Sequence, residues 1–262
     1  MNVVDISFLS LAAGYGLLIF PLSIILWYRI PIVSDTLLAM LRMTVQLLFV
    51  GLYLQVVFSL NNFWLNGAWL LVMIGVADTS ITRGCGLRLS RFAGPLFLSL
   101  LVGTAVPLFF FVVPILGRPH LLDAQYAIPI GGMILGNCLR ADIIGVSNFY
   151  RSIRKSQKAF LQALAQGARL VEATRPFLRD ACHAALAPTV ASMATIGLVS
   201  LPGMMTGVIL AGADPMTAIK YQIAIMIAIF SGTAITITMA IWLTMKSSFT
   251  TYGVLDGRIF KS

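Results

Sequence analysis

Seven runs of apolar residues, each long enough to cross a lipid bilayer, constrain this chain more than any other feature. A helix needs about 20 residues to cross a hydrocarbon core of roughly 30 Å. Of the 262 residues, 59% are hydrophobic and 10% are charged, so little of the chain is left for a soluble domain. The sequence predicts a single all-α transmembrane domain over residues 1–262, a polytopic bundle of about seven helices. The predicted spans are 8–27, 37–58, 64–81, 95–116, 127–149, 185–212 and 222–245.

The sixth predicted span differs from the others because Leu201-Pro202-Gly203 lies near its middle. Proline has no N–H for the helix ladder, and a break at membrane depth is tolerated where it lines a cavity or is buried in protein. The sequence therefore leaves two alternatives open, a broken helix and a re-entrant segment. In either case residues 200–207 are the favoured moving or substrate-facing element.

The basic residues predict the orientation of the bundle. With the N-terminus outside, fourteen of the 18 Lys and Arg residues fall in inside gaps, and only Arg118 and Lys220 fall outside. Cytoplasmic loops carry such an excess, so we expect a cytoplasmic C-terminus and a multi-pass protein of the cell (plasma) membrane. The net charge of +9 then reflects orientation in the lipid bilayer, and no nucleic-acid partner is expected.

Motifs of catalysis and of cofactor binding are missing from the sequence. It has no G-x-x-x-x-G-K-[ST] phosphate loop, no HExxH and no GxSxG. Cys85, Cys138 and Cys182 are widely spaced, and His120 and His183 lie in separate gaps, so no metal ligands are assigned. We expect a protein that is not an enzyme and holds no cofactor, so any ATP would be bound by a partner subunit.

The one sizeable polar stretch, residues 150–184, is predicted to be a cytoplasmic loop of short amphipathic helices with Gly167 at a helix end. Such a loop suits the docking of an ATPase, since force must pass from a soluble motor to the membrane helices. A basic helix lying on anionic lipid is the alternative. The candidate docking residues are Gln166, Gly167, Ala168, Arg169 and Glu172.

A dense set of motifs lies between residues 129 and 222. The longest reads Gly-Leu-Val-Ser-Leu-Pro-Gly-Met-Met at 197–205, and shorter ones lie at 133–137, 167–168, 178–180, 185–190, 211–215 and 218–222. These motifs resemble the FetB family, which comprises bacterial iron-export ABC permeases and related plant aluminium-tolerance permeases. The resemblance implies a permease that pairs with a separate ABC ATPase subunit, works as a homodimer and exports a metal ion, iron first among them. The segment around Gly167 also resembles, loosely, the cytoplasmic loop of other ABC permeases, in which a short acidic-alanine motif precedes a glycine. Here Gln162-Ala163-Leu164 stands where the acidic residue is expected.

Charged residues inside the predicted spans need partners, because a charge at the bilayer centre costs at least about 2.5 kcal/mol. Arg140 and Asp142 lie about 200° apart on one helix and cannot pair with each other. We therefore expect Arg140 to meet Asp78 or a lipid headgroup, and Asp142 to meet Arg42 across the bundle. Two roles are possible for these charged residues. They either form ion pairs that stabilise the bundle or take a direct part in transport.

A candidate translocation path combines the polar face of the fifth span with the sixth span. Its residues are Met133, Asn137, Arg140, Ser200, Pro202, Gly203, Met204 and Met205. Methionine thioethers suit soft ions such as copper(I) and are poor ligands for hard iron, and they also fill gaps in ordinary packing. The residues alone do not choose a metal or a direction of transport.

Two other functions are compatible with the sequence. One is a membrane scaffold or sensor that recruits a soluble partner through the 150–184 loop. The other is an ion-driven secondary transporter, which the lack of a detectable inverted repeat disfavours. The expected partners are therefore an ATPase subunit, a second copy of the chain and the lipid bilayer.

Overall fold

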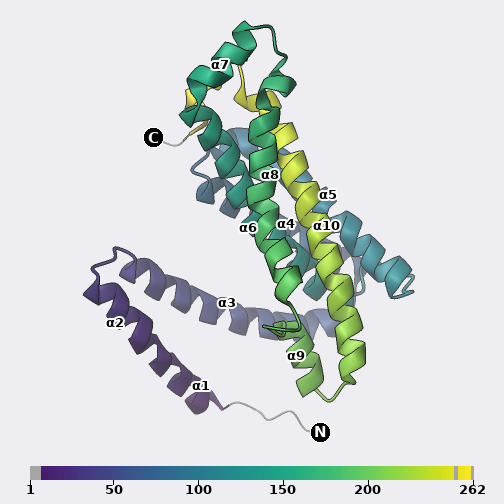
Figure 1. Ribbon diagram of the computed structural model, residues 1–262. Coiled ribbons are helices and arrows are strands. Elements are labelled where there is room, and N and C mark those ends of the chain that lie inside the picture. Colours follow the sequence, from purple (N-terminus) through teal and green to yellow (C-terminus); the bar gives the residue numbers. More distant parts are fainter. Residues whose placement is uncertain (1–6, 251–252, 261–262) are drawn as a thin grey trace.

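The computed structural model describes residues 7–250 and 253–260, most of them helical. Figure 1 shows the elements in order. They are α1 (Phe8–Tyr15), η1 (Gly16–Leu18), α2 (Ile19–Trp27), α3 (Val33–Leu60), α4 (Phe63–Gly84), α5 (Leu89–Phe110), η2 (Phe111–Ile115), α6 (Ala124–Lys155), α7 (Gln157–Ala165), α8 (Leu170–Thr195), α9 (Gly203–Leu210), α10 (Pro215–Ser248) and η3 (Gly257–Ile259).

Within the described residues, six helical stretches are long and apolar enough to cross a membrane. They coincide with six of the seven predicted spans, and they confirm an all-α polytopic bundle. They are Leu9–Trp27, Val33–Leu60, Phe63–Gly84, Leu89–Ile115, Ala124–Lys155 and Pro215–Ser248.

The remaining predicted span, 185–212, is not one helix. α8 ends at Thr195 and α9 begins at Gly203, with Pro202 as the residue before α9. Between them Gly197 has φ +84°, and its N–H donates to the carbonyl of Ser200 at 2.9 Å. Figure 1 shows α8 and α9 together running the length of the bundle, so the broken-helix alternative is the one observed.

Helices α4, α5, α6, α8 and α10 pack into a bundle, in which α10 lies along α5 and α6, and α8 lies on α6 and α10. We call its two ends the α7 end and the α9 end. The α7 end also holds the α4–α5 turn and the C-terminal residues, as Figure 1 shows. The polar stretch 150–184 is predicted from the sequence to be a loop of short helices. In the structure its two ends belong to long helices instead, because α6 continues to Lys155 and α8 already starts at Leu170.

Glycines allow a close helix contact in the bundle, where α5 crosses α10. A Cβ on Gly232 would lie 2.7 Å from the carbonyl oxygen of Gly103, and one on Gly103 would lie 2.2 Å from Cγ2 of Thr236. The GxxxG spacings in the sequence point elsewhere, at 132–136 and 203–207. Of those four glycines only Gly132 has a neighbour within 4 Å, so GxxxG spacing did not locate the tight crossing.

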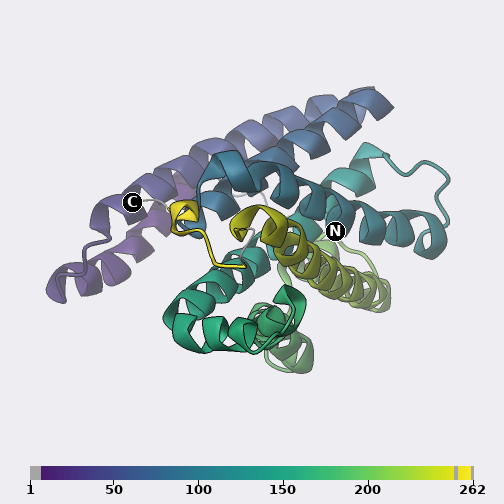
Figure 2. The same ribbon diagram turned by 90° about the horizontal axis from the view of Figure 1, so that it is seen from above.

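The N-terminal hairpin, made of α1, η1, α2 and α3, stands apart from most of the bundle in Figure 1 and lies along one side of it in Figure 2. Tyr15 and Thr44 share a hydrogen bond between its two arms. Only the last turns of α3 reach the bundle, where Val57 is buried and the ring of Tyr53 stacks on Trp69 at 4.1 Å. Most of α3, including Arg42, is exposed.

Candidate functional site

A polar cavity of about 130 Å³ lies beside α8 at the middle of the bundle. Its α6 wall is a stripe of residues spaced three or four apart, including Asn137 and Arg140, which therefore share one face. The amide of Asn137 donates to the carbonyl of Met133 at 2.8 Å, and the hydroxyl of Ser192 donates to the carbonyl of Pro188 at 3.0 Å. The lining residues are Asn137, Arg140, Ala141, Ile144, Ala185, Pro188, Thr189, Ser192 and Met226.

A larger and mostly apolar cavity of about 410 Å³ lies next to it, where the break between α8 and α9 faces α10. Met193, Met205 and Met226 contribute three thioethers, and Gln222 is its one amide side chain. Met226 lines both cavities. We call the two cavities together the α8 groove. The remaining lining residues are Ile196, Gly197, Leu201, Pro202, Ile219, Ile223 and Ile227.

The α8 groove contains four of the eight residues of the predicted path. Asn137 and Arg140 line the polar cavity, and Pro202 and Met205 line the apolar one. The other four line neither cavity. Met133 and Met204 pack half-buried against the core, whereas Ser200 and Gly203 are exposed beside the break.

Sequence reasoning missed several residues of the groove. Thr189 and Ser192 lie three apart on α8, and Gln222 and Met226 lie four apart on α10, so each pair shares one helix face. That spacing was a usable signal. It could not show that α8 and α10 turn these faces toward α6.

The expected ion pairs inside the membrane do not form. The ion pairs between described residues all involve Asp256, so the predicted pairs Arg140–Asp78 and Arg42–Asp142 are wrong. A lipid headgroup as the partner of Arg140 stays a prediction. Asp142 is fully buried with both carboxyl oxygens unpaired, and Oδ1 of Asp78 is likewise buried without a partner. The reason is geometric, because Arg42 belongs to the separate hairpin and Arg140 faces the α8 groove.

The candidate docking residues form a compact turn at the α7 end, between α7 and α8. Gly167 adopts φ +92°, which favours glycine, and its N–H donates to the carbonyl of Leu164 at 3.0 Å. The backbone N–H of Arg169 donates to Oε2 of Glu172 at 2.8 Å and so caps α8. Gln166, Gly167, Arg169 and Glu172 are exposed and Ala168 is half-buried. We call residues 157–195, with this turn at the tip, the docking hairpin.

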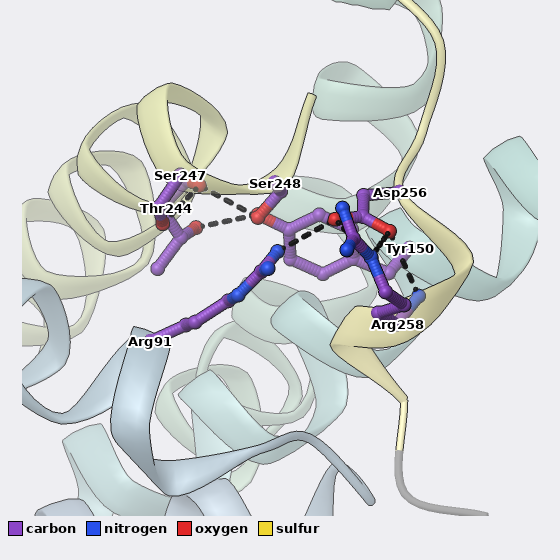
Figure 3. A network of polar contacts seen from close by, with 7 residues as sticks. All are labelled: Arg91, Tyr150, Thr244, Ser247, Ser248, Asp256 and Arg258. Carbon is purple, nitrogen blue, oxygen red and sulfur yellow. Dashed lines mark hydrogen bonds and ion pairs between the residues drawn. The ribbon is translucent and has the colours of Figure 1, made fainter. Parts of the chain in front are cut away.

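The C-terminal residues connect several helices at the α7 end of the bundle. Sequence reasoning missed these contacts. Figure 3 shows Asp256 between two arginines, with Oδ2 at 2.7 Å from Nη1 of Arg91 and Oδ1 at 3.0 Å from Nε of Arg258. Beside them the hydroxyl of Tyr150 donates to Oγ1 of Thr244 at 2.7 Å and lies 2.9 Å from Oγ of Ser248.

The same segment reaches the docking hairpin and α5. The ring of Phe249 lies 5.8 Å from that of Phe160 on α7, and the N–H of Arg88 donates to the carbonyl of Ile259 at 2.9 Å. We call residues 249–250 and 253–260 the C-terminal strap. It joins α5, α7 and α10 at one end of the bundle.

The strap should loosen when Asp256 loses its charge. Hydrogen bonds from Arg258 and Arg91 lower the pKa of Asp256 below its ordinary value of about 3.9. The ion pairs of Asp256 therefore stabilise the fold at pH values above the ordinary aspartate pKa. This stabilisation is lost as the pH falls from that value through the lowered pKa of Asp256. We expect Asp256→Asn to raise hydrogen exchange of the strap several-fold at neutral pH. Exchange as slow as in the wild type would contradict this, and Asp180→Asn, at an exposed site on α8, is the matched control.

An all-helical bundle with several membrane-crossing helices and a partly polar groove beside α8 defines a polytopic membrane protein. Residues 8–249 match the Uncharacterised protein family (UPF0014), and the chain belongs to that family. No solved structure matches the chain significantly.

Three relatives place the family among membrane proteins of bacteria and plants. The chain is 34% identical to the UPF0014 membrane protein slr1647 of Synechocystis sp., over 87% of this chain and 88% of the relative. It is 31% identical to the probable iron export permease protein FetB of Escherichia coli, over 95% of each chain. It is 29% identical to the protein ALUMINUM SENSITIVE 3 of Arabidopsis thaliana, over 94% and 90%. The resemblance noted in the sequence is thereby confirmed.

Proposed function

We propose that this chain is the membrane-spanning permease subunit of an ABC transporter that exports a metal, with iron as the first candidate. Two copies of the chain would form the membrane part, and a separate ATPase subunit would bind and hydrolyse ATP. The α8 groove is the proposed translocation path. The name of the E. coli relative, a probable iron export permease, supports the choice of metal.

The observation that carries this proposal is a direct connection between the proposed docking turn and the proposed path. α6 leads into α7, the turn follows α7, and α8 leads out of the turn. The helices before and after the α7 turn unit, α6 and α8, also form two walls of the groove. Phe160 on α7 packs against Phe177 on α8 with ring centroids 6.2 Å apart. Movement of the docking hairpin would therefore be transmitted to the groove through packed side chains.

Metal content of cells tests the function. We expect cells that produce the chain with its ATPase to hold less iron under iron excess than cells that lack the chain. Parallel cultures in excess aluminium, copper and zinc show which metal the effect follows. A strain that has the chain but lacks the ATPase is the control and should retain the metal.

Equal metal content in all strains, for all four metals, would contradict the proposed function. If the chain still co-purified with a soluble partner in that case, a scaffold or sensor would be the better description. If metal content fell without any ATPase, the chain would be an independent transporter.

A further inference from the structure

Arg140 lies where a lone positive charge is hardest to accommodate in a membrane protein. It is near the middle of the 32-residue α6, with about 22 Å of helix on either side. α6 is longer than the roughly 30 Å hydrocarbon core, so its middle lies inside the core when the helix crosses the membrane. Arg140 is exposed and has no carboxylate partner among the described residues. Charges at this depth face a water-filled cavity or another protein surface.

The rest of the groove carries no opposite charge. The two membrane-depth carboxyl groups, those of Asp78 and Asp142, are buried and line neither cavity. The other described acids cap helices, belong to the C-terminal strap or lie outside the groove, so the polar cavity offers one guanidinium, one amide and two hydroxyl groups.

A bare metal cation would be poorly accommodated by this lining. Arg140 would repel it, and no carboxylate, histidine or cysteine lines either cavity to ligate it. Guanidinium groups instead bind carboxylates and phosphates through two parallel hydrogen bonds. The chemistry of the groove therefore fits an anion.

We propose that the cargo enters the α8 groove as an anionic complex, a metal ion wrapped by carboxylate chelators, and that Arg140 binds its outer carboxylate oxygens. Asn137, through its second amide hydrogen, and Thr189 donate further hydrogen bonds to the complex. The methionine-lined cavity beside them accepts its less polar surface. This inference rests on the proposed function and replaces a free ion by a complex of the opposite charge.

Binding to the purified full-length chain in lipid nanodiscs tests the inference, with ferric citrate, metal-free citrate and ferrous ion as separate probes. We expect ferric citrate to bind the wild type and ferrous ion not to bind. Arg140→Gln should weaken ferric citrate binding at least tenfold. Arg140→Lys keeps the positive charge but cannot form the two parallel hydrogen bonds of a guanidinium group, and it should weaken binding less. Arg42→Gln removes another membrane-depth arginine, outside the groove, and should leave binding unchanged.

Three results would overturn the inference. One is ferrous ion binding the wild type more tightly than ferric citrate, with no loss in Arg140→Gln. Another is a shift of Arg140→Gln to a smaller species in size-exclusion chromatography, which would place Arg140 in a contact between copies. The third is no binding of ferric citrate while the chain still lowers cellular iron, which leaves the proposed function standing. Equal binding of metal-free and ferric citrate would support anion recognition and count against metal export.

Discussion

Gly232→Ala is expected to destabilise the bundle strongly although it adds only one methyl group. The new Cβ would lie 2.7 Å from the carbonyl oxygen of Gly103 and 2.9 Å from Cγ2 of Ile134. The first neighbour is backbone and cannot rotate away, so α5 and α10 must separate. Overpacking a core costs typically about 1–3 kcal/mol, and more where backbone has to move. We expect a clear fall in the Tm of the purified protein and in its monodisperse yield.

Gly136→Ala provides the matched control. Gly136 lies in α6, a Cβ added to it would meet no atom within 4 Å, and alanine is the better helix former. Its Tm should equal or exceed that of the wild type. Equal Tm values for Gly232→Ala and Gly136→Ala would show that α5 and α10 do not approach as closely as described.

Loss of the tip of the docking hairpin is expected to abolish association with the ATPase subunit. Deleting 166–173 removes the turn and the first residues of α8, and the two proteins should no longer co-elute. That deletion also removes buried Ala173, so it disturbs folding as well as docking. A surface substitution separates the two effects.

Arg169→Glu is that substitution. The Arg169 side chain is exposed, and the cap on α8 uses only its backbone N–H, so the turn should survive. If this turn docks the ATPase, reversal of its charge should lower the affinity at least tenfold, about 1.4 kcal/mol. Lys158→Glu, at the far end of α7, is the control and should bind normally. Full binding of Arg169→Glu together with loss in Lys158→Glu would move the interface away from the turn.

Much of the fold could be predicted because the bilayer leaves few choices for an apolar chain. Runs of apolar residues located α3 to α6 and α10 within several residues, since a spanning helix must satisfy its own backbone. Pro202 and Gly203 located the interruption before α9, and Gly167 located the turn before α8. These are local signals that depend on one or two residues.

Features that depend on helix orientation could not be predicted. Nothing in the spacing of Arg42 shows that α3 stands apart from the bundle, which removes Arg42 from the reach of Asp142. GxxxG spacing is common in a chain with 22 glycines, whereas the tight crossing joins single glycines of two helices. The pair Arg91–Asp256 spans 165 residues of sequence. Such contacts appear only once the helices are arranged in space.

The separate N-terminal hairpin has a consequence for the order of events during synthesis. The side chain of Asn61, at the end of α3, accepts a hydrogen bond from the N–H of Ala124, 63 residues later, and buried Val57 packs with Ala124 and Ile128. Before α6 has been synthesised, α4 is the one bundle helix that the hairpin can contact. We therefore expect the hairpin to insert into lipid as an independent pair of helices and to complete its contacts with the bundle only after α6 has been made.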